Sequence, residues 1–309
     1  MHYPVNPIIF TLLLSGIFFR VFSQNDSKAY VISGITKAKL GDSKAAILDF
    51  DTAIALDLME AEAHYNRGIA KSELKDYSGA IEDFNRVIDL KPFYAEPYFN
   101  RGLVKDYLKD YYGAISDYSK AISIKPDFAD AYLNIGLAKF DLGDFSEAIN
   151  DFTRALQYKP DYAESLYNRG LAKFNLQDYP GAIEDFTQAI ELDHSSADYF
   201  SSRGAAKAAA GLYEDAVGDF TQSIQIHPDD ISTLMNRGLA YLYLKKFQEA
   251  VDDYTKIIQN DPSNQEAFAN RGVSRQYLND LTGACEDWKK SSELGSVKAG
   301  NYLKKYCSP

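Results

Sequence analysis

The sequence contains few of the residues that usually carry catalytic chemistry. Among 309 residues there are 4 histidines and 2 cysteines. None of the histidines stands at a metal-ligand spacing from a cysteine or a carboxylate. No glycine-rich phosphate-binding loop occurs either. These absences disfavour an enzyme, and we expect neither a metal nor a cofactor. The histidines are His2, His64, His194 and His227.

Positive charge is also scarce relative to negative charge. The chain has 33 lysines and arginines against 44 aspartates and glutamates, which gives a formal net charge of -11. Binding to a nucleic-acid backbone needs clustered lysine and arginine. The composition therefore excludes nucleic acid as the expected partner.

Long hydrophobic runs are absent apart from one near the start, from Ile8 to Phe19. A run of this length is too short to span a bilayer comfortably and is typical of a signal peptide. Val21 and Ser23 suit cleavage before Gln24, although no lysine or arginine precedes the run. We predict a signal peptide at 1–23, either cleaved or kept as an anchor, and hence an exported protein: periplasmic, secreted or envelope-associated.

What the chain does have is a strict period of 34 residues, which eight glycines mark without insertion or deletion. Such a period indicates stacked supersecondary units that each need neighbours to bury an apolar face. The glycines are Gly34, Gly68, Gly102, Gly136, Gly170, Gly204, Gly238 and Gly272.

Other positions repeat with the glycine. An alanine follows it by twelve residues, an aromatic residue by sixteen, and in five repeats a proline by 24. Small residues let two helices approach closely, the aromatic ring fills the space between them, and proline marks a helix end. An aspartate such as Asp76 precedes the second helix as a plausible N-cap, repeated at Asp110, Asp144 and Asp178.

This combination resembles the tetratricopeptide repeat, a helix-turn-helix unit of 34 residues. The resemblance implies an all-α fold, a right-handed α-solenoid superhelix with a C-terminal capping helix. Within 24–298 it gives eight repeats, and a capping helix and tail follow at 299–309. The repeats are 27–60, 61–94, 95–128, 129–162, 163–196, 197–230, 231–264 and 265–298.

Two columns of opposite charge accompany the glycine, an arginine just before it in six repeats and an aspartate fifteen residues after it in all eight. Pairing within a repeat would leave Asp49 and Asp151 facing Ser33 and Ile135. Pairing between repeats leaves only Asp117 unmatched, so we predict half-buried, bidentate pairs between consecutive repeats. Two independent solvated columns are the alternative. The predicted pairs are Asp49 with Arg67, Asp83 with Arg101, Asp151 with Arg169, Asp185 with Arg203, Asp219 with Arg237, and Asp253 with Arg271.

The two cysteines leave two interpretations. Export would permit a disulfide between Cys285 and Cys307. However, Cys285 occupies a column that isoleucine holds in other repeats, as at Ile81 and Ile115. A buried free thiol acting as a small hydrophobic residue is therefore favoured.

The resemblance also implies a concave groove lined by the first helix of each repeat. Its floor would carry apolar residues that include Tyr65, Phe99, Phe140, Tyr167 and Phe174. Acidic residues such as Glu62 and Glu96 would follow one edge, so the groove should prefer an extended partner segment with hydrophobic and basic side chains. Simple packing between neighbouring first helices is the alternative.

A row of asparagines stands two residues before the glycine. An amide offers both a donor and an acceptor, so the row can hold the backbone of an extended peptide whatever its sequence. This row resembles the asparagine ladder of some peptide-binding superhelices, and a purely structural role is the alternative. The residues are Asn66, Asn100, Asn134, Asn168, Asn236 and Asn270.

The sixth repeat departs most from the others because it is rich in alanine, as at Ala205, Ala208 and Ala209. Its small side chains should widen the groove locally and admit a bulky partner side chain, unless this repeat is merely softer. We predict an exported, non-enzymatic scaffold that binds a peptide or protein segment in its groove. The alternative is a structural subunit of an envelope-associated assembly that uses the convex face and the ends.

Overall fold

The structure is a computed structural model that describes residues 26–307. The signal peptide predicted at 1–23 lies outside the described residues. Over residues 26–307 every regular element is a helix, and none of these helices is long and apolar enough to cross a membrane. The fold is thus an all-α solenoid of helix-turn-helix repeats.

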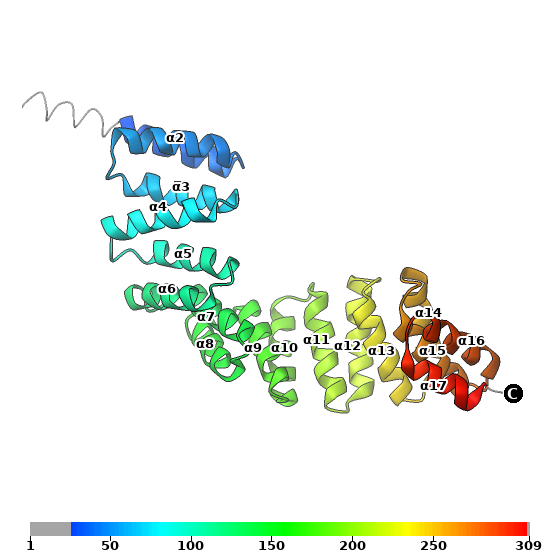
Figure 1. The fold of residues 1–309 in the computed structure, drawn as a ribbon. Coiled ribbons are helices and arrows are strands. Elements are labelled where there is room, and N and C mark those ends of the chain that lie inside the picture. The colour runs from blue at the N-terminus through cyan, green and yellow to red at the C-terminus, as the bar shows by residue number, and fades with distance from the viewer. Residues whose placement is uncertain (1–25, 308–309) are drawn as a thin grey trace, which may run out of the picture. The chain divides into compact units, whose positions relative to one another are not determined.

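The helices belong to two compact units that divide between Asp144 and Phe145. Within each unit, consecutive helices pack against each other in chain order (Figure 1). Unit 1 begins with a helical stretch at 26–39 and continues with α2 (Ser43–Leu56), α3 (Ala61–Glu73), α4 (Tyr77–Leu90), α5 (Ala95–Tyr107), α6 (Tyr111–Ile124) and α7 (Ala129–Asp141).

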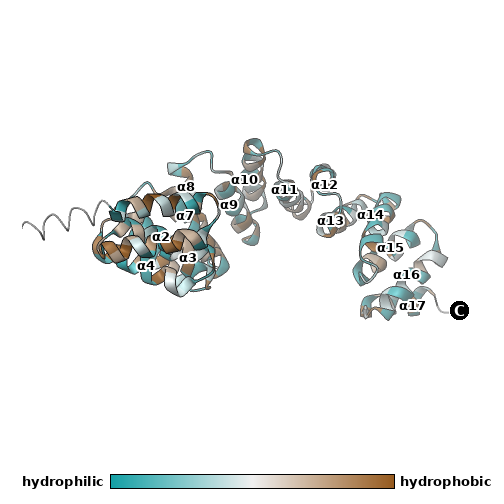
Figure 2. Ribbon diagram, turned by 90° about the horizontal axis from the view of Figure 1, so that it is seen from above, coloured by the Kyte–Doolittle hydropathy of each residue, from teal (hydrophilic) through white to brown (hydrophobic). Residues whose placement is uncertain are grey.

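Unit 2 continues the same alternation of first and second helices and ends with one additional helix. Polar and apolar residues share the individual helices of both units, as expected of amphipathic elements (Figure 2). The helices are α8 (Phe145–Tyr158), α9 (Ala163–Asn175), α10 (Tyr179–Leu192), α11 (Ala197–Ala209), α12 (Tyr213–Ile226), α13 (Ile231–Tyr243), α14 (Phe247–Asn260), α15 (Gln265–Tyr277), α16 (Leu281–Glu293) and α17 (Val297–Tyr306).

The turn within a repeat is short and follows one design. In the second repeat, Lys75 adopts a φ of 64° after α3, and the side chain of Asp76 then accepts a hydrogen bond from the Gly79 N–H at the start of α4. Asp110 and Asp178 cap α6 and α10 in the same way, which confirms these three predicted N-caps. The second helices end two residues before the recurring proline, as α4 does at Leu90 before Pro92.

The repeated glycine sets how closely the two helices of a repeat approach. A Cβ atom at Gly204 would lie 2.7 Å from Cε1 of Phe220, and one at Gly68 would lie 2.8 Å from Cε1 of Phe84. Both phenylalanine side chains are almost completely buried. The aromatic ring therefore occupies the space that any larger residue at the glycine would need, as the sequence predicted.

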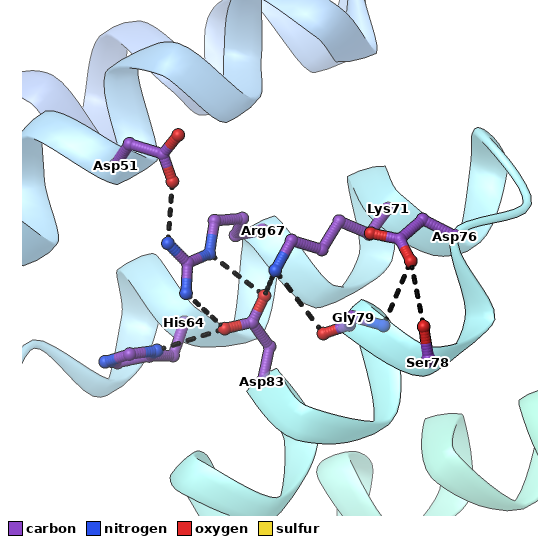
Figure 3. A network of polar contacts seen from close by, with 8 residues as sticks. All are labelled: Asp51, His64, Arg67, Lys71, Asp76, Ser78, Gly79 and Asp83. Atoms are coloured by element: carbon purple, nitrogen blue, oxygen red, sulfur yellow. Dashed lines mark hydrogen bonds and ion pairs between the residues drawn. The ribbon is translucent and has the colours of Figure 1, made fainter.

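The predicted ion pairs between consecutive repeats are wrong, because each arginine pairs with the aspartate of its own repeat. Arg67 donates from Nε and Nη2 to the two carboxylate oxygens of Asp83, at 2.9 and 2.6 Å (Figure 3). The bidentate geometry that we predicted is present, but the sequence separation is 16 instead of 18. The other pairs are Arg101 with Asp117, Arg169 with Asp185, Arg203 with Asp219, Arg237 with Asp253, and Arg271 with Asp287.

The glycine contact explains this separation. Glycine and aromatic ring also stand sixteen residues apart, and they fix the register of the helix pair. The arginine one residue earlier is long enough to reach the aspartate one residue before the ring. In the first repeat, Asp49 has no arginine opposite it; it accepts a hydrogen bond from Ser33 at 2.6 Å and pairs with Lys37 at 2.6 Å. An aspartate without an arginine opposite it is therefore still paired within its own repeat.

The arginine nevertheless does connect consecutive repeats, through its remaining nitrogen. Nη1 of Arg67 lies 2.6 Å from Oδ1 of Asp51, which belongs to the preceding repeat (Figure 3). In unit 2 the equivalent partner is a threonine hydroxyl, as for Arg203 with Thr187 and Arg237 with Thr221. One guanidinium therefore joins three helices.

A second cation, which the sequence analysis missed, completes most of these sites. Nζ of Lys71 lies 2.8 Å from Oδ2 of Asp83, and lysines three residues after the glycine repeat this contact at Asp117, Asp185 and Asp219. Burial raises the pKa of Asp83, but hydrogen bonds from His64, Arg67 and Lys71 outweigh it and hold the pKa well below its usual range. The seventh repeat has Tyr241 in place of the lysine.

The C-terminal end differs from the sequence prediction in one respect. Helix α17 begins at Val297 and packs against α16, in the region where we predicted the cap. The favoured free thiol at Cys285 is wrong, because Cys285 forms a disulfide with Cys307. The reason is that α17 runs back along α16, so its last turn reaches the level of Cys285, whose side chain is only half-buried.

Candidate functional site

Two recesses of unit 2 lie over the sixth to eighth repeats. One cavity of about 510 Å³ separates the sixth and seventh repeats, and a second of about 400 Å³ separates the seventh and eighth. Leu239 and Tyr243 line both cavities, so the two cavities adjoin each other, and we call them together the unit 2 groove.

Alanines of α11 open the first of these cavities. Ala205, Ala208 and Ala209 line it, where the fifth repeat has Leu171, Phe174 and Asn175 at the equivalent positions. Phe174 itself lines the cavity on the side of the fifth repeat. The small residues of the sixth repeat therefore line an apolar recess with room for a large side chain; that a partner side chain occupies it stays a prediction.

Stacked aromatic rings form the outer wall of the groove. Tyr213 and Tyr243 stack at 4.6 Å between ring centroids with an interplanar angle of 4°, and Phe247 and Tyr277 stack at 4.6 Å and 7°. Each pair joins a second helix to the first helix of the next repeat. Tyr243 keeps 67% of its surface exposed, so the wall presents an aromatic face to solvent.

The sequence analysis missed these stacked pairs, although a signal for them exists. An aromatic residue stands nine positions after the glycine in six repeats, at Tyr77, Tyr111, Phe145, Tyr179, Tyr213 and Phe247. The sequence alone does not show how consecutive repeats are aligned. This alignment places the aromatic residue against the residue five positions after the glycine of the next repeat.

The asparagine row divides into groups with different contacts. Asn66, Asn134 and Asn168 donate to backbone carbonyls four residues earlier in their own helices. Asn100 donates to the hydroxyl of Tyr65 at 2.7 Å, and Asn270 lies 3.6 Å from the sulfur of Met235. These contacts favour a structural part for several members of the row.

Three asparagines nevertheless line cavities. Asn236 lines the first cavity of the unit 2 groove and Asn270 the second. Asn66 lines a separate cavity of about 600 Å³ in unit 1, together with Tyr65 and Phe93.

The predicted floor aromatics are half-buried and mostly pack against the cores of their units. Phe99 contacts Tyr118 and Phe128, and Tyr167 contacts Phe186 and Tyr199. Tyr65 packs on Phe84 and Tyr94 while it lines the unit 1 cavity. Burial, reinforced by Tyr94, raises the pKa of Tyr65 to about 12. Phe140 lies half-buried on α7.

The described residues offer no arrangement for metal chemistry. Over 26–307, no group of three or more histidine, cysteine, aspartate or glutamate side chains is placed to hold a metal ion. The buried aspartates are instead engaged by the arginines and lysines of the repeats. The unit 2 groove offers a ligand apolar surface, aromatic rings, amides and, in its second cavity, the side chains of Lys245 and Lys298.

Sequence models of the tetratricopeptide repeat match much of the chain. One matches residues 133–197 and 169–231, a second matches 61–94 and 231–264, and a third, described as a TPR repeat, matches 107–143. Together they account for more than half of the sequence. No curated protein sequence matches the chain.

Solved structures of such repeat proteins are similar in fold. The C-terminal part of a TPR repeat-containing protein from Cytophaga hutchinsonii aligns with a TM-score of 0.67 at 19% identity and covers 78% of this chain and 98% of its own. A tetratricopeptide repeat protein from Parabacteroides merdae aligns at 0.57 and 22%, covering 80% and 99%. YrrB, described as a TPR protein with an unusual peptide-binding site, aligns at 0.56 and 20%, covering 61% and 97%.

These identities support the fold alone, while the family models match the repeats themselves. The period of 34 residues, the glycine packed against an aromatic ring and the helix pairs of both units agree with those matches. The chain belongs to the tetratricopeptide repeat family.

Proposed function

We propose that this protein is a non-enzymatic interaction scaffold that binds an extended segment of a partner protein in the unit 2 groove. Proteins of this repeat family generally serve as protein-interaction scaffolds. The observation that carries the proposal is the pair of adjoining cavities walled by the Tyr213–Tyr243 and Phe247–Tyr277 stacks.

The groove is suited to apolar side chains of the partner. A cavity of about 510 Å³ that is lined by three alanines of α11 accepts a bulky aliphatic or aromatic residue. Such a side chain is stabilised against the exposed aromatic rings of the groove. Burial of apolar area contributes to this stabilisation, and offset or tilted ring contacts contribute further. The second cavity accepts a further residue of the same segment.

Amide side chains in the groove supply polar contacts for the partner's backbone. Asn236 and Asn270 lie one repeat apart in the two cavities. Packed helices lie roughly 8–10 Å apart, and an extended chain rises about 3.3 Å per residue. Amides on successive first helices are therefore spaced to meet about every third residue of a bound strand.

The partner segment that we propose is hydrophobic with basic residues beside the apolar anchors. Support comes from the net charge of -11 of the whole chain. A negative net charge steers basic segments by long-range attraction. The second cavity of the groove is itself lined by Lys245 and Lys298, so the basic residues of the partner would lie outside that cavity.

We further propose that the protein is exported. The Cys285–Cys307 disulfide supports this, since structural disulfides persist mainly in oxidising compartments. Cell fractionation with detection of the mature N-terminus by mass spectrometry tests the proposal. Recovery of the full-length chain with free thiols in the cytosolic fraction would contradict it.

Filling the groove tests the binding proposal. A displayed library of random twelve-residue peptides is selected on the whole protein, and the dissociation constants of the enriched peptides are measured. Ala208→Phe places a ring in the first cavity and should weaken binding by about tenfold or more, because the anchor side chain loses its site.

The matched control is Gln222→Phe, which adds the same ring to an exposed position on α12, the second helix of the same repeat. This variant should bind as the parent does. Peptides that lose affinity with Gln222→Phe and keep it with Ala208→Phe would support the alternative, a structural subunit that uses its convex face.

A further inference from the structure

The last helix, α17, completes the second cavity of the unit 2 groove. Two of its residues, Lys298 and Tyr302, line this cavity together with Asn270 of α15. Tyr302 also packs on the buried ring of Trp288, with 5.0 Å between the ring centroids. Helix α17 is therefore a wall of the cavity as well as a cover for the core of the eighth repeat.

Helix α17 has less support than the first helices of the repeats in unit 2. Helices α9, α11, α13 and α15 each pack against two second helices, one of their own repeat and one of the repeat before. No second helix follows α17 within the described residues, so α16 is the second helix against which it packs. A helix of 10 residues is marginal by itself in water. The position of α17 thus depends on what fastens it to α16.

The chain fastens α17 covalently at both of its ends. Its first residue, Val297, follows α16 after a short turn at 294–296. Its C-cap residue, Cys307, forms the disulfide with Cys285, which lies near the start of α16. The two helices therefore run antiparallel, and the disulfide lies at the opposite end of α17 from the turn. Without the disulfide, α17 is attached at its start only.

The cysteine on α16 is a departure from the repeat. Isoleucine or valine holds the equivalent position, thirteen residues after the glycine, in the other seven repeats. Both cysteines of the chain are used in this one bond at the end of the array. Each of them is half-buried. Core packing does not require a cysteine here, because a β-branched residue fills this position elsewhere.

We propose that the Cys285–Cys307 disulfide controls the second cavity, so that the oxidised chain alone holds the partner segment in both cavities. The inference rests on the proposed function of the unit 2 groove. A dithiol reductant opens the bond: its thiolate attacks one sulfur, the S–S bond breaks, the reductant leaves as a disulfide, and each cysteine gains one hydrogen. Tyr302 then moves away with α17, and the partner segment loses this wall. Cys285 and Cys307 are positioning residues, since they act on the segment through Tyr302.

Distances between two spin labels test the wall without any ligand. Noncanonical amino acids that carry a nitroxide replace Lys245, which lines the second cavity, and Asn301, an exposed residue of α17. Double electron–electron resonance should give one narrow distance in the parent and a broad distribution in Cys285→Ser with Cys307→Ser. The control pair at Gln222 and Lys245 does not include α17 and should stay narrow. An unchanged distance between positions 245 and 301 would overturn the proposal.

Peptide affinity tests the consequence for binding. Peptides selected on the oxidised protein are measured again after reduction with dithiothreitol. Their dissociation constants should rise about tenfold, as the loss of one main anchor contact predicts. The variant Cys285→Ser with Cys307→Ser should bind as the reduced parent does, and dithiothreitol should leave its affinity unchanged.

Two different failures can be told apart in these measurements. Equal affinity of the oxidised and reduced parent for peptides that Ala208→Phe weakens would overturn the control by the disulfide and leave the binding proposal standing. Peptides whose affinity Ala208→Phe does not change would contradict the proposed function itself, and the control by the disulfide would fail with it.

Discussion

At the scale of single residues, close contact between a glycine and an aromatic ring determines the geometry of each repeat. A Cβ at Gly34 would come within 2.5 Å of Phe50, and most of the other repeats show contacts nearly as short. The same register places arginine and aspartate of one repeat together. The repeating sequence pattern therefore predicted which residues pack between the two helices. It did not predict the ion-pair partners, because these depend on how the two helices of a repeat are aligned along their length.

A pair of glycines in the sixth repeat tests this contact. Gly204→Ala should lower the free energy of unfolding by about 1–3 kcal/mol, because the new methyl group overlaps the ring of Phe220. Gly218→Ala is the control, since nothing lies within 4 Å of a Cβ there; it should raise stability by about 0.5–1 kcal/mol through helix propensity. Urea unfolding measures both, and equal effects would contradict the contact.

The seventh repeat tests the part played by the second cation. Among the described residues, Arg237 is the one ion-pair partner of Asp253. Burial raises the pKa of Asp253, whereas the pKa of Asp83 is lowered. A raised pKa in the folded state means that ionised Asp253 costs stability as the pH rises through that pKa. Tyr241→Lys should supply the missing ammonium and lower the pKa of Asp253.

Carboxyl ¹³C chemical shifts followed against pH report this pKa directly. Asp83, which already contacts both Arg67 and Lys71, serves as the internal control, and its lowered pKa should be the same in parent and variant. An Asp253 pKa that stays the same or rises in the variant would show that the lysine column does not act on the aspartate.

At the scale of elements, the helix boundaries follow from residues that the sequence displays. Aspartate caps such as Asp76 and the prolines two residues beyond α4, α6 and α8 are local signals, so helices and turns could be placed in advance. The disulfide could not, because it depends on where α17 lies against α16. The packing of a terminal helix is a tertiary property, and it cannot be predicted from the position of Cys285 within its repeat.

The disulfide should hold α17 in place over the core of the last repeat. It closes a sequence separation of 22 residues, for which loop entropy predicts about 3 kcal/mol of stabilisation. Trp288, the one tryptophan of the chain, is fully buried and packs against Tyr302 and Tyr306 of α17. Reduction should loosen α17 and expose Trp288 to water.

Hydrogen exchange and tryptophan fluorescence measure this effect. In the reduced protein, and in Cys285→Ser with Cys307→Ser, amides of α17 should exchange faster and the emission of Trp288 should shift to longer wavelength. Amides of α11 and α12 are the control and should keep their protection. Unchanged exchange in α17 would mean that side-chain packing alone holds this helix.

At the scale of the whole molecule, regular repeats supply a scaffold, and departures from the repeat supply its recesses. The alanines of α11 line a cavity in unit 2. Sequence comparison between the repeats identified the alanine-rich repeat as exceptional. It did not identify the stacked aromatic walls, because those arise between repeats, where residues five and nine positions after different glycines meet.

The central claim is that a partner segment binds in the unit 2 groove, and photo-crosslinking in the producing cells tests it most directly. A benzophenone amino acid replaces Tyr243 in the groove or, separately, Gln222 on the exposed face of α12. We predict a discrete adduct from position 243, and this adduct should disappear when Ala208→Phe fills the cavity. We predict no adduct from position 222. Adducts formed only from position 222, or from position 243 regardless of Ala208→Phe, would contradict it.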